Sequence, residues 1–566
     1  MASIIKKKIK NQIYYYYAES KRIDGKPRLV NQKYLGTAEK LLELQLLSKK
    51  PIAEQVLHSN ESEFGSVMLI YDIASRLGIA DIVDGILPKR KQGASIGTHI
   101  LTAAINRVAD PTSKNGLAEW YASTCLPVAT GLKPSAFSPQ NFWNNTCVSG
   151  EEVDLIEDAI LRKVVDTYDI DTSHIIYDAT NFFTYIDTMQ GSELAKRGHN
   201  KEKRNGLRIV GLSLMVSPDF AIPLLHETYP GNRPDSKEFH VMMGKLKARY
   251  GAITKSKADV TVVFDRGNNA EDNIELLESG EIKLHYIGGL KKNQAKEFFS
   301  IPHSKYTPLN SPSLEGQLAC RREMEVFGRN VTVLIVYNPE LEKGQMQGIL
   351  INIWRTEEKL AALQQRLIRR ANGELKGGKK PTAESVACAA GKILAPEYMN
   401  DIFICEISEK NGYIHLDYEC SEEQLVQISV EWLGKTVLFT DRKDFTNEQI
   451  VAAYRSAWHV ESAFKQMKNP KHLAVRPIFH WTDDKIRVHI FICVLALRLC
   501  SLLIKELSQK GIQITINRLI DDMSGLKRIS TFFGDINKPK IVESFTLGSD
   551  LAKQIEGIYQ LKAKYS

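Results

Sequence analysis

The sequence lacks the paired cysteines on which zinc sites and disulfide frameworks are built. None of its eight cysteines belongs to a Cys-x2-Cys pair, and no histidines cluster at zinc-ligand spacing; the cysteines stand at positions 125, 147, 320, 388, 405, 420, 493 and 500. Scattered cysteines with mostly apolar neighbours indicate reduced thiols in a cytoplasmic protein. We therefore expect no structural zinc.

Long apolar runs are missing as well. No stretch reaches the roughly 18 residues that a membrane-spanning helix needs. The longest candidate, Ile490–Ile504, contains Arg498 and is expected to form a buried helix. No apolar signal core follows the N-terminal lysines, which argues against secretion. We expect no membrane partner.

The composition is that of a soluble protein with several domains. The chain has 566 residues, of which 43% are hydrophobic and 25% charged, whereas a typical domain has roughly 100–200 residues. The net charge of +8 is modest, but the first fifty residues hold twelve Lys or Arg against four Asp or Glu. Further basic clusters lie at 196–208 and 366–380. Separated basic segments favour a protein that follows a phosphate backbone, and ordinary solvated surface is the alternative.

The N-terminal part of the chain divides into two predicted regions. Residues 8–36 alternate between apolar and polar, with Asp24-Gly25 between two strand-like runs, so residues 1–60 are expected to form a basic β-hairpin region. Residues 61–170 have the periodicity of short helices joined by glycine-containing turns. A helix-turn-helix-like DNA-binding domain and a plain helical bundle both fit this pattern.

From residue 171 the pattern predicts an α/β core. Three apolar strands are followed by a helix, a strand, a helix and a strand, which is the order of an RNase H-like fold. We assign residues 171–291 to the first part of this core and 436–510 to its second part, which contains a helix over 447–468. Residues 292–435 read as a β-rich insertion domain with one basic helix, 357–370, and strand-like pieces such as 348–354. Residues 511–566 form a C-terminal region that is a candidate for dimerisation.

Three acidic residues are candidate metal ligands because of their positions. Asp178 ends an apolar strand, Asp265 ends another and precedes an Arg-Gly turn, and Glu461 lies within a predicted helix. Carboxylates at the carboxyl edge of an open α/β sheet point toward ligands. Magnesium prefers such oxygen ligands, and two ions about 4 Å apart can stabilise both oxygens of a phosphoryl displacement. Taken singly, an Asp after a strand is more often a turn residue, and a helical Glu is more often on the surface.

The residues around Glu461 carry a family resemblance. The segment 454–468, YRSAWHVESAFKQMK, is similar to the Tyr-x2-Arg-x3-Glu-x6-Lys signature of DDE transposases from bacterial insertion sequences. Tyr454, Glu461 and Lys468 match the signature, and Ala457 replaces its arginine. The segments 229–239, 262–277 and 473–497 also resemble this family, so the likeness covers about 170–500. The insertion domain accounts for the 196 residues between Asp265 and Glu461.

The resemblance implies an activity, cofactors and partners. It implies a metal-dependent endonuclease and DNA strand transferase that uses Mg2+, with Mn2+ able to substitute. The implied partner is double-stranded DNA, bound at the terminal inverted repeats of the element and at a target. It also implies cut-and-paste transposition by a homodimer, in bacterial or archaeal cytoplasm on the nucleoid. An RNase H-like nuclease without strand transfer, or a DNA-binding protein derived from a transposase, would contain the same fold.

Several further residues are predicted to contact DNA. By resemblance, Tyr454 and Lys468 contact phosphates near the cleaved end. Lys465 lies close to the same predicted helix face, and Arg455 is a candidate replacement for the missing arginine, although from a different face. Trp458 could stack on an unpaired base, but a core position is the favoured reading. The last candidates belong to a basic loop: Lys196, Arg197 and Arg204.

Overall fold

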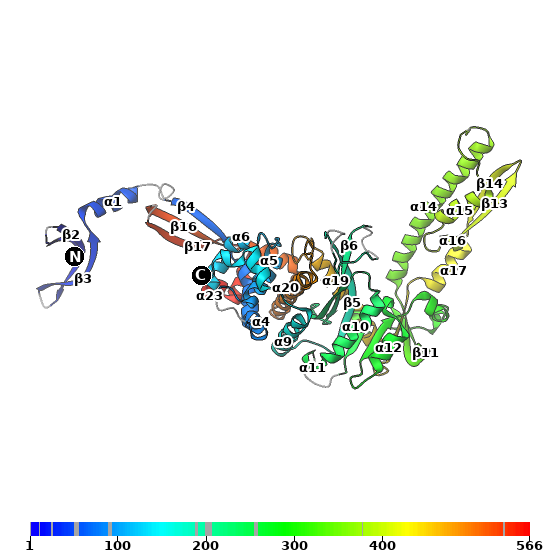
Figure 1. The fold of residues 1–566 in the computed structure, drawn as a ribbon, viewed down its shortest axis with the longest axis horizontal. Helices are drawn as coiled ribbons and strands as arrows, with labels where there is room; N and C mark the ends of the chain where they lie inside the picture. Colours follow the sequence, from blue (N-terminus) through cyan, green and yellow to red (C-terminus); the bar gives the residue numbers. More distant parts are fainter. Residues whose placement is uncertain are drawn as a thin grey trace. The chain divides into compact units, whose positions relative to one another are not determined.

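The computed structural model describes the whole chain except residues 1, 11, 24–25, 50–55, 89–92, 187–190, 199–205, 254–258, 376, 536–537 and 566. The chain divides into two compact units. One unit comprises residues 1–73, 108–141 and 514–566, and the other comprises residues 74–107 and 142–513. Figure 1 shows the fold and labels the helices and strands for which there is room.

The larger unit is built around a nine-stranded sheet of order β10-β11-β12-β15-β9-β8-β5-β6-β7. Its first five strands in the chain occur in the order that the sequence predicts: three antiparallel strands, then a helix, a strand, a helix and a strand. They are β5 (His174–Thr184), β6 (Arg208–Val216), β7 (Pro223–Pro230), β8 (Thr261–Phe264) and β9 (His285–Gly289). Strands β5, β8 and β9 are parallel neighbours, so the carboxyl ends of these three strands lie at one edge of the sheet.

The other four strands correct the predicted insertion domain. They extend the same sheet beyond β9, although β10, β11 and β12 fall in the segment that was assigned to the insertion. Their bounds are β10 (Thr307–Pro308), β11 (Leu318–Val326), β12 (Arg329–Tyr337) and β15 (Lys435–Thr440). Alternating apolar residues predict a strand but not its partner, because pairing depends on residues far away in the chain. Here β12 pairs with β15 and β15 pairs with β9.

The insertion itself is mainly helical rather than β-rich. It contains one β-hairpin and four helices: α14 (Pro339–Ala371), α15 (Ala383–Ile393), α16 (Met399–Ile402), β13 (Phe403–Lys410), β14 (Tyr413–Cys420) and α17 (Glu422–Trp432). The predicted strand 348–354 lies inside α14. A short apolar run does not distinguish strand from helix. Asn338, which caps the helix, and Pro339 at its first turn start α14 well before that run.

The insertion has its own hydrophobic core. Leu360 of α14, Met399 of α16 and Leu416 of β14 are buried at its centre. Val386 of α15 and Ile428 of α17 belong to the same cluster. Every helix of the insertion and its hairpin therefore contribute to one core.

Helix α20 (Asp483–Gln509) is the predicted apolar helix, and it is buried. It is long and apolar enough to cross a membrane by length and composition, but 94% of its most apolar window is buried in the fold. A helix that is apolar all round belongs in the interior of a protein. It packs against β7, α9 (Gly150–Tyr168) and α19 (Trp458–Met467).

A buried ion network joins α9, β7 and α20. Glu157 of α9 is fully buried and contacts His226 at 2.7 Å, Arg498 at 3.1 Å and Arg249 at 3.2 Å. Burial alone would raise the pKa of Glu157, but His226, Arg249 and Arg498 lower it well below its usual range. Arg498 also donates to the carbonyl oxygen of Pro223 at 2.8 Å. The sequence showed Arg498 only as an interruption in an apolar run.

The smaller unit contains two antiparallel sheets. The first consists of β1 (Ala2–Ile9), β2 (Gln12–Ile23) and β3 (Lys26–Gly36), followed by α1 (Ala38–Lys49). The predicted hairpin is thus part of a three-stranded sheet, and its Asp24-Gly25 turn lies outside the described residues. The second sheet consists of β4 (Val56–Glu63), β16 (Lys527–Asp535) and β17 (Lys538–Phe545).

The predicted boundaries at 61–170 and 511–566 differ from the observed units. Within 61–170, residues 61–73 and 108–141 belong to the smaller unit, whereas 74–107 and 142–170 belong to the larger one. The C-terminal strands are not a separate region, because β16 pairs with β4 from Lys527 opposite Glu63 to Phe533 opposite Val56. A pairing between such distant segments leaves no local signal in the sequence.

Candidate active site

Asp178 and Asp265 stand side by side on neighbouring parallel strands. Tyr177 of β5 is in register with Phe264 of β8, so the two aspartates occupy the next position along each strand. Neighbouring strands are about 4.8 Å apart, which places the two carboxylates within reach of one ligand. Asp178 does not end its strand as predicted, since β5 continues to Thr184 in its pairing with β6.

The loop after Asp265 is fixed by hydrogen bonds. The backbone N–H of Asn268 donates to the carbonyl oxygen of Asp265 at 3.1 Å. The Asn269 side chain donates to the carbonyl oxygen of Gly289 at 2.7 Å, which ties the loop to β9. The Asn273 side chain donates to the carbonyl oxygen of Asn268 at 2.9 Å. Asp265 itself is exposed to solvent, as a ligand for substrate or ion must be.

Glu461 lies on the second of two short helices rather than on the single predicted helix. These helices are α18 (Asn447–Arg455) and α19 (Trp458–Met467), with a turn at Ser456 and Ala457. The Ser456 hydroxyl donates to the carbonyl oxygen of Ala453 at 2.5 Å, and the N–H of His459 donates to the carbonyl oxygen of Ser456 at 2.9 Å. Such three-residue hydrogen bonds tighten the turn and bend a helix.

The two helices pack on different strands of the sheet. Helix α18 contacts β8 and β9, whereas α19 contacts β5 and β6. At the end of α19, the Lys468 ammonium donates to the Thr180 hydroxyl at 2.9 Å, two residues beyond Asp178 on β5. Glu461 is exposed near the start of α19. The fold therefore brings the helix of Glu461 onto the strand of Asp178.

Tyr454 of α18 contacts the second aspartate. Its hydroxyl lies beside Asp265 and Arg266, and burial, followed by the Asp265 charge, raises the pKa of Tyr454. Gly289 makes this contact possible, because a Cβ atom at that position would overlap the Tyr454 hydroxyl. Neither the Tyr454–Asp265 contact nor Gly289 was predicted, since both depend on the alignment of β8 with β9.

The donor set suits a hard divalent cation bound together with substrate. Asp178, Asp265 and Glu461 offer only carboxylate oxygens, which Mg2+ and Mn2+ prefer and which zinc seldom uses alone. Within the part of the chain that the structure describes, no three His, Cys, Asp or Glu side chains are close enough to hold one ion together. Magnesium is commonly held by one or two carboxylates and completed by water and phosphate oxygens, so the pair Asp178–Asp265 meets that need.

Comparison with known proteins identifies the family. A model of the transposase DDE domain matches residues 169–499, which is more than half of the chain and includes all three carboxylates. The chain belongs to the DDE transposase family. It is a transposase enzyme of the DDE class, a family whose members use divalent metal ions.

Two further comparisons complete this result. A solved structure of the piggyBac transposase synaptic complex with hairpin DNA is similar to this transposase, with a TM-score of 0.37 and 9% sequence identity. The similarity covers 83% of this chain and 82% of that chain. No curated protein matches this transposase.

The remaining predicted DNA contacts of the transposase lie in different surroundings. Lys465 is exposed on α19. Arg455 is partly buried and donates to the Gln317 side chain, and burial lowers its pKa. Trp458 is 58% exposed and its ring lies 3.9 Å from that of His459, so the favoured prediction of a core tryptophan is wrong. The exposed ring is available for stacking.

The predicted basic loop is described only in part. Lys196 exchanges two backbone hydrogen bonds with Ile209 of β6, which anchors the start of the loop to the central sheet. Arg197 is exposed, and Arg204 lies outside the described residues.

The segment after α19 in the transposase returns to β5. The N–H of Leu473 donates to the carbonyl oxygen of Arg107 at 2.7 Å, and the Arg107 side chain donates to the carbonyl oxygen of Ala474 at 3.3 Å. The N–H of Tyr185 then donates to the carbonyl oxygen of Ile478 at 2.9 Å. These bonds fix the end of the strand that carries Asp178. Nothing in the sequence marked Arg107 for this role.

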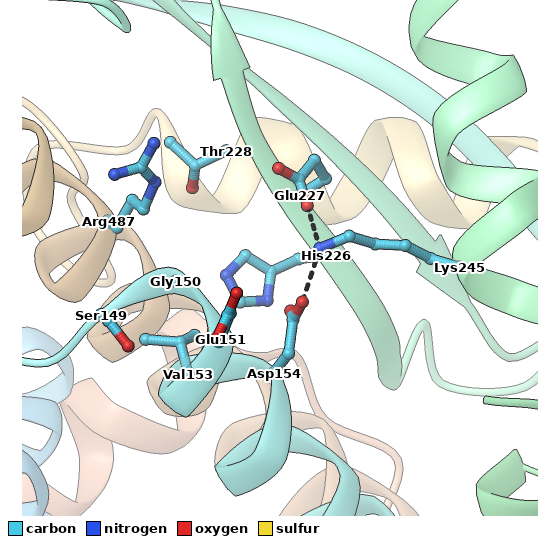
Figure 2. Close-up of a pocket in the computed structure, with 10 residues that line it drawn as sticks. All are labelled: Ser149, Gly150, Glu151, Val153, Asp154, His226, Glu227, Thr228, Lys245 and Arg487. Carbon is cyan, nitrogen blue, oxygen red and sulfur yellow. Dashed lines mark hydrogen bonds and ion pairs between the residues drawn. The ribbon is translucent and has the colours of Figure 1, made fainter. Parts of the chain in front are cut away.

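A separate pocket of about 440 Å³ lies at the start of α9 and beside β7. Figure 2 shows Lys245 between Asp154 and Glu227, with the Lys245–Asp154 contact at 2.8 Å. Among the described residues that line it, none is a predicted metal ligand. Strand β6 separates β7 from β5, so this pocket is distinct from the site of the three carboxylates.

Proposed function

We propose that this transposase cuts the ends of an insertion sequence and joins the released 3′-hydroxyl to target DNA. The observation that carries the proposal is the alignment of Asp178 with Asp265 inside the matched DDE domain. The helix of Glu461 packs on the strand of Asp178, which supports its role as the third carboxylate. The strand order β7-β6-β5-β8-β9 supports an RNase H-like core.

The reaction that these residues support is phosphoryl transfer by positioning and charge neutralisation. Asp178, Asp265 and Glu461 would hold two divalent ions, Mg2+ or Mn2+, which when bound stabilise the attacking and leaving oxygens of the phosphodiester. The Tyr454 hydroxyl lies beside the Asp265 carboxylate and would help to hold its orientation. Lys468 lies beside β5, where its positive charge can hold the DNA strand next to the cut.

The order of events follows from the same chemistry. Water attacks a phosphodiester at the transposon end, and the 3′-hydroxyl that leaves this step then attacks a phosphodiester of the target DNA. Each step exchanges one P–O bond for another, so no covalent bond between protein and DNA is needed. We propose a cut-and-paste pathway in which a homodimer holds two terminal inverted repeats, in the cytoplasm of a bacterial or archaeal host.

Incubation of the purified transposase with duplexes of its element's terminal repeats and a supercoiled target tests the proposal. With Mg2+ or Mn2+ we expect nicks at the repeat boundary and joined products, and with EDTA neither product. Nicked ends without joined products would instead indicate a nuclease without strand transfer. Absence of metal-dependent cutting at any duplex, although the protein binds the repeats, would overturn the enzymatic assignment of the three carboxylates.

A further inference from the structure

The first sheet of the smaller unit has two faces of different charge. Strand β2 is its central strand, and alternate residues of a strand point to opposite faces, while residues directly opposite on neighbouring strands share a face. The register pairs Lys6 with Tyr15 and Lys8 with Ile13 on one side of β2, and Tyr17 with Lys33 on the other. All of these residues belong to the face of the odd-numbered residues of β2.

This face, here called the basic face, carries a large excess of positive charge. Lys21 of β2 is opposite Arg28 of β3, and Ile23 is opposite Lys26. Among the described residues of the three strands, the basic face therefore has six cations against one acidic residue, Glu19, and all six cations are exposed: Lys6, Lys8, Lys21, Lys26, Arg28 and Lys33. Like charges directly opposite each other destabilise a sheet. The pair Lys21–Arg28 thus has a cost that a polyanionic partner would remove.

The opposite face is aromatic and much less charged. Tyr16 is opposite Tyr34, and their rings are 5.3 Å apart in an edge-on arrangement. The only cations on this face of the described strands are Lys7 and Arg22, and the Lys7 ammonium lies 5.0 Å from the Tyr16 ring centre. Because the two faces are formed by the same three strands, the charge difference is a property of the register and not of the N-terminal composition alone.

We propose that the basic face of the β1–β2–β3 sheet binds the major groove of double-stranded DNA. The two outer strands of a three-stranded sheet are about 10 Å apart, which is close to the roughly 12 Å width of that groove. Cations on the outer strands, such as Lys6 and Lys33, then face the phosphates on either side. Tyr15 and Tyr17, on the central strand between these lysines, face the floor of the groove. Sheets that read DNA in this way are an alternative to the recognition helix.

This inference rests on the proposed function for the identity of the nucleic acid, but it concerns binding and not cleavage. It assigns DNA recognition to a sheet rather than to the helical region 61–170, for which the sequence left a DNA-binding domain and a plain helical bundle both open. Phosphate contacts give affinity that depends on salt, whereas contacts in the groove give discrimination between sequences.

Two double variants of the full chain test the proposal with the same change in charge. Lys6→Gln/Lys21→Gln removes two cations from the basic face, and Lys7→Gln/Arg22→Gln removes two from the opposite face of the same two strands. Binding to a duplex of the element's terminal repeat is measured by fluorescence anisotropy without divalent ions, across a range of salt concentrations. Equal melting temperatures of both variants and the wild type verify that the sheet is intact.

We expect the basic-face variant to bind at least roughly tenfold more weakly at about 0.1 M salt, and its salt slope to fall by about two. The opposite-face variant should keep the wild-type slope, since screening at this salt limits charge effects to about 10 Å. Equal losses in both variants, or no loss in the basic-face variant, would overturn the proposal. If the wild type binds the duplex but never cuts it with Mg2+, the proposed function fails while this inference stands.

Discussion

The proposed chemistry depends on three carboxylates, those of Asp178, Asp265 and Glu461. Each can be tested by replacing its carboxylate with an amide. Asp178→Asn, Asp265→Asn and Glu461→Gln remove the ligand charge but keep the shape of the side chain. We expect each to slow cutting at least about a thousandfold, because holding a divalent ion is worth several kcal/mol to the transition state. Gel shifts should show that end binding persists.

The control is Asp272→Asn, a change of an exposed residue in the first turn of α12 (Glu271–Glu278), and this variant should cut normally. Normal cutting by a carboxylate variant would remove that residue from the site.

A second residue-scale prediction concerns Gly289, which allows Tyr454 to reach Asp265. Gly289→Ala places a methyl group against the Tyr454 hydroxyl and displaces it from the carboxylate. We expect the cutting rate to fall roughly 10- to 100-fold, in the range found when one preorganised hydrogen bond is lost, with DNA binding unchanged. Gly391→Ala, which meets no atom within 4 Å, is the control. If the mechanism is right, Gly289→Ala adds little to the defect of Tyr454→Phe, because both changes remove one interaction. Fully additive defects would show that Gly289 acts elsewhere.

The sequence pointed to the three carboxylates but not to their neighbours. An aspartate after an apolar strand and a glutamate inside a known signature are local patterns. The contact of Tyr454 with Asp265 and the space at Gly289 both require the alignment of β8 with β9. Neither depends on a local pattern, so neither could be read from the sequence. The three carboxylates remain predictions until the variants are tested.

At the scale of elements, the ion network around Glu157 holds two helices and an edge strand together. Glu157→Gln leaves the buried Arg498 and Arg249 without their shared counter-charge, which typically costs about 3–5 kcal/mol. We expect urea denaturation to show a loss of that size. Arg487→Met, which breaks the partly exposed pair with Asp484 at 3.4 Å, should cost about 0–1 kcal/mol. Similar losses of the free energy of unfolding in the two variants would mean that the buried network stabilises the fold no more than an exposed ion pair does.

Helix α10 (Asp235–Ala248), which packs against β7, carries a carboxyl group, that of Glu238, whose protonation makes the stability of the fold depend on pH. Burial raises the pKa of Glu238 from 4.5 to about 7, although Arg233 and Ser213 donate hydrogen bonds to its carboxylate. Because the folded state keeps this proton up to a higher pH than the unfolded state, the free energy of unfolding falls as pH rises from about 4.5 to 7. The contribution is at most about 3 kcal/mol. Denaturation at several pH values should show a flatter profile for Glu238→Gln, and parallel profiles would contradict the assignment.

The element scale also shows where periodicity fails. The helices and strands of 173–289 were predicted in the right order because each has strong, local apolar periodicity. Residues 329–337, which lie in the segment predicted as the insertion, form β12 of the core sheet, and the run 348–354 was predicted as a strand although it lies within α14. Periodicity identifies the type of a long element, whereas partners and short apolar runs depend on tertiary contacts.

At the scale of the whole molecule, the insertion is a candidate for removal without loss of the core. Its two ends meet, because the N–H of Asn338 donates to the carbonyl oxygen of Gly434 at 2.8 Å, and it has its own hydrophobic cluster. We expect a chain in which residues 340–432 are replaced by a short glycine linker to fold with a melting temperature within a few degrees of the wild type. The excised segment, expressed alone, should show cooperative unfolding. Aggregation of the shortened chain together with failure of the segment to fold would show that the two parts depend on each other.

The division into two units was the least predictable property of the chain. Each unit is assembled from separate stretches of sequence, and the sequence marks only the ends of elements, not the order in which they associate. The expected domains at 61–170 and 511–566 were based on changes in the local pattern of apolar and polar residues, whereas the observed units follow the pairing of β4 with β16.

The pairing of β4 with β16 has a consequence for the synthesis of the protein on the ribosome. Strand β4 ends at Glu63, and its partner β16 begins at Lys527. At about 5–20 residues per second, β4 waits for roughly half a minute to a minute and a half before its partner is synthesised. The larger unit is synthesised within this interval, and its last residue, Gln513, precedes β16 by only 14 residues. A chain whose translation stops between residues 513 and 527 therefore has the sheet of the carboxylates but lacks β16, the partner that β4 needs to complete its sheet.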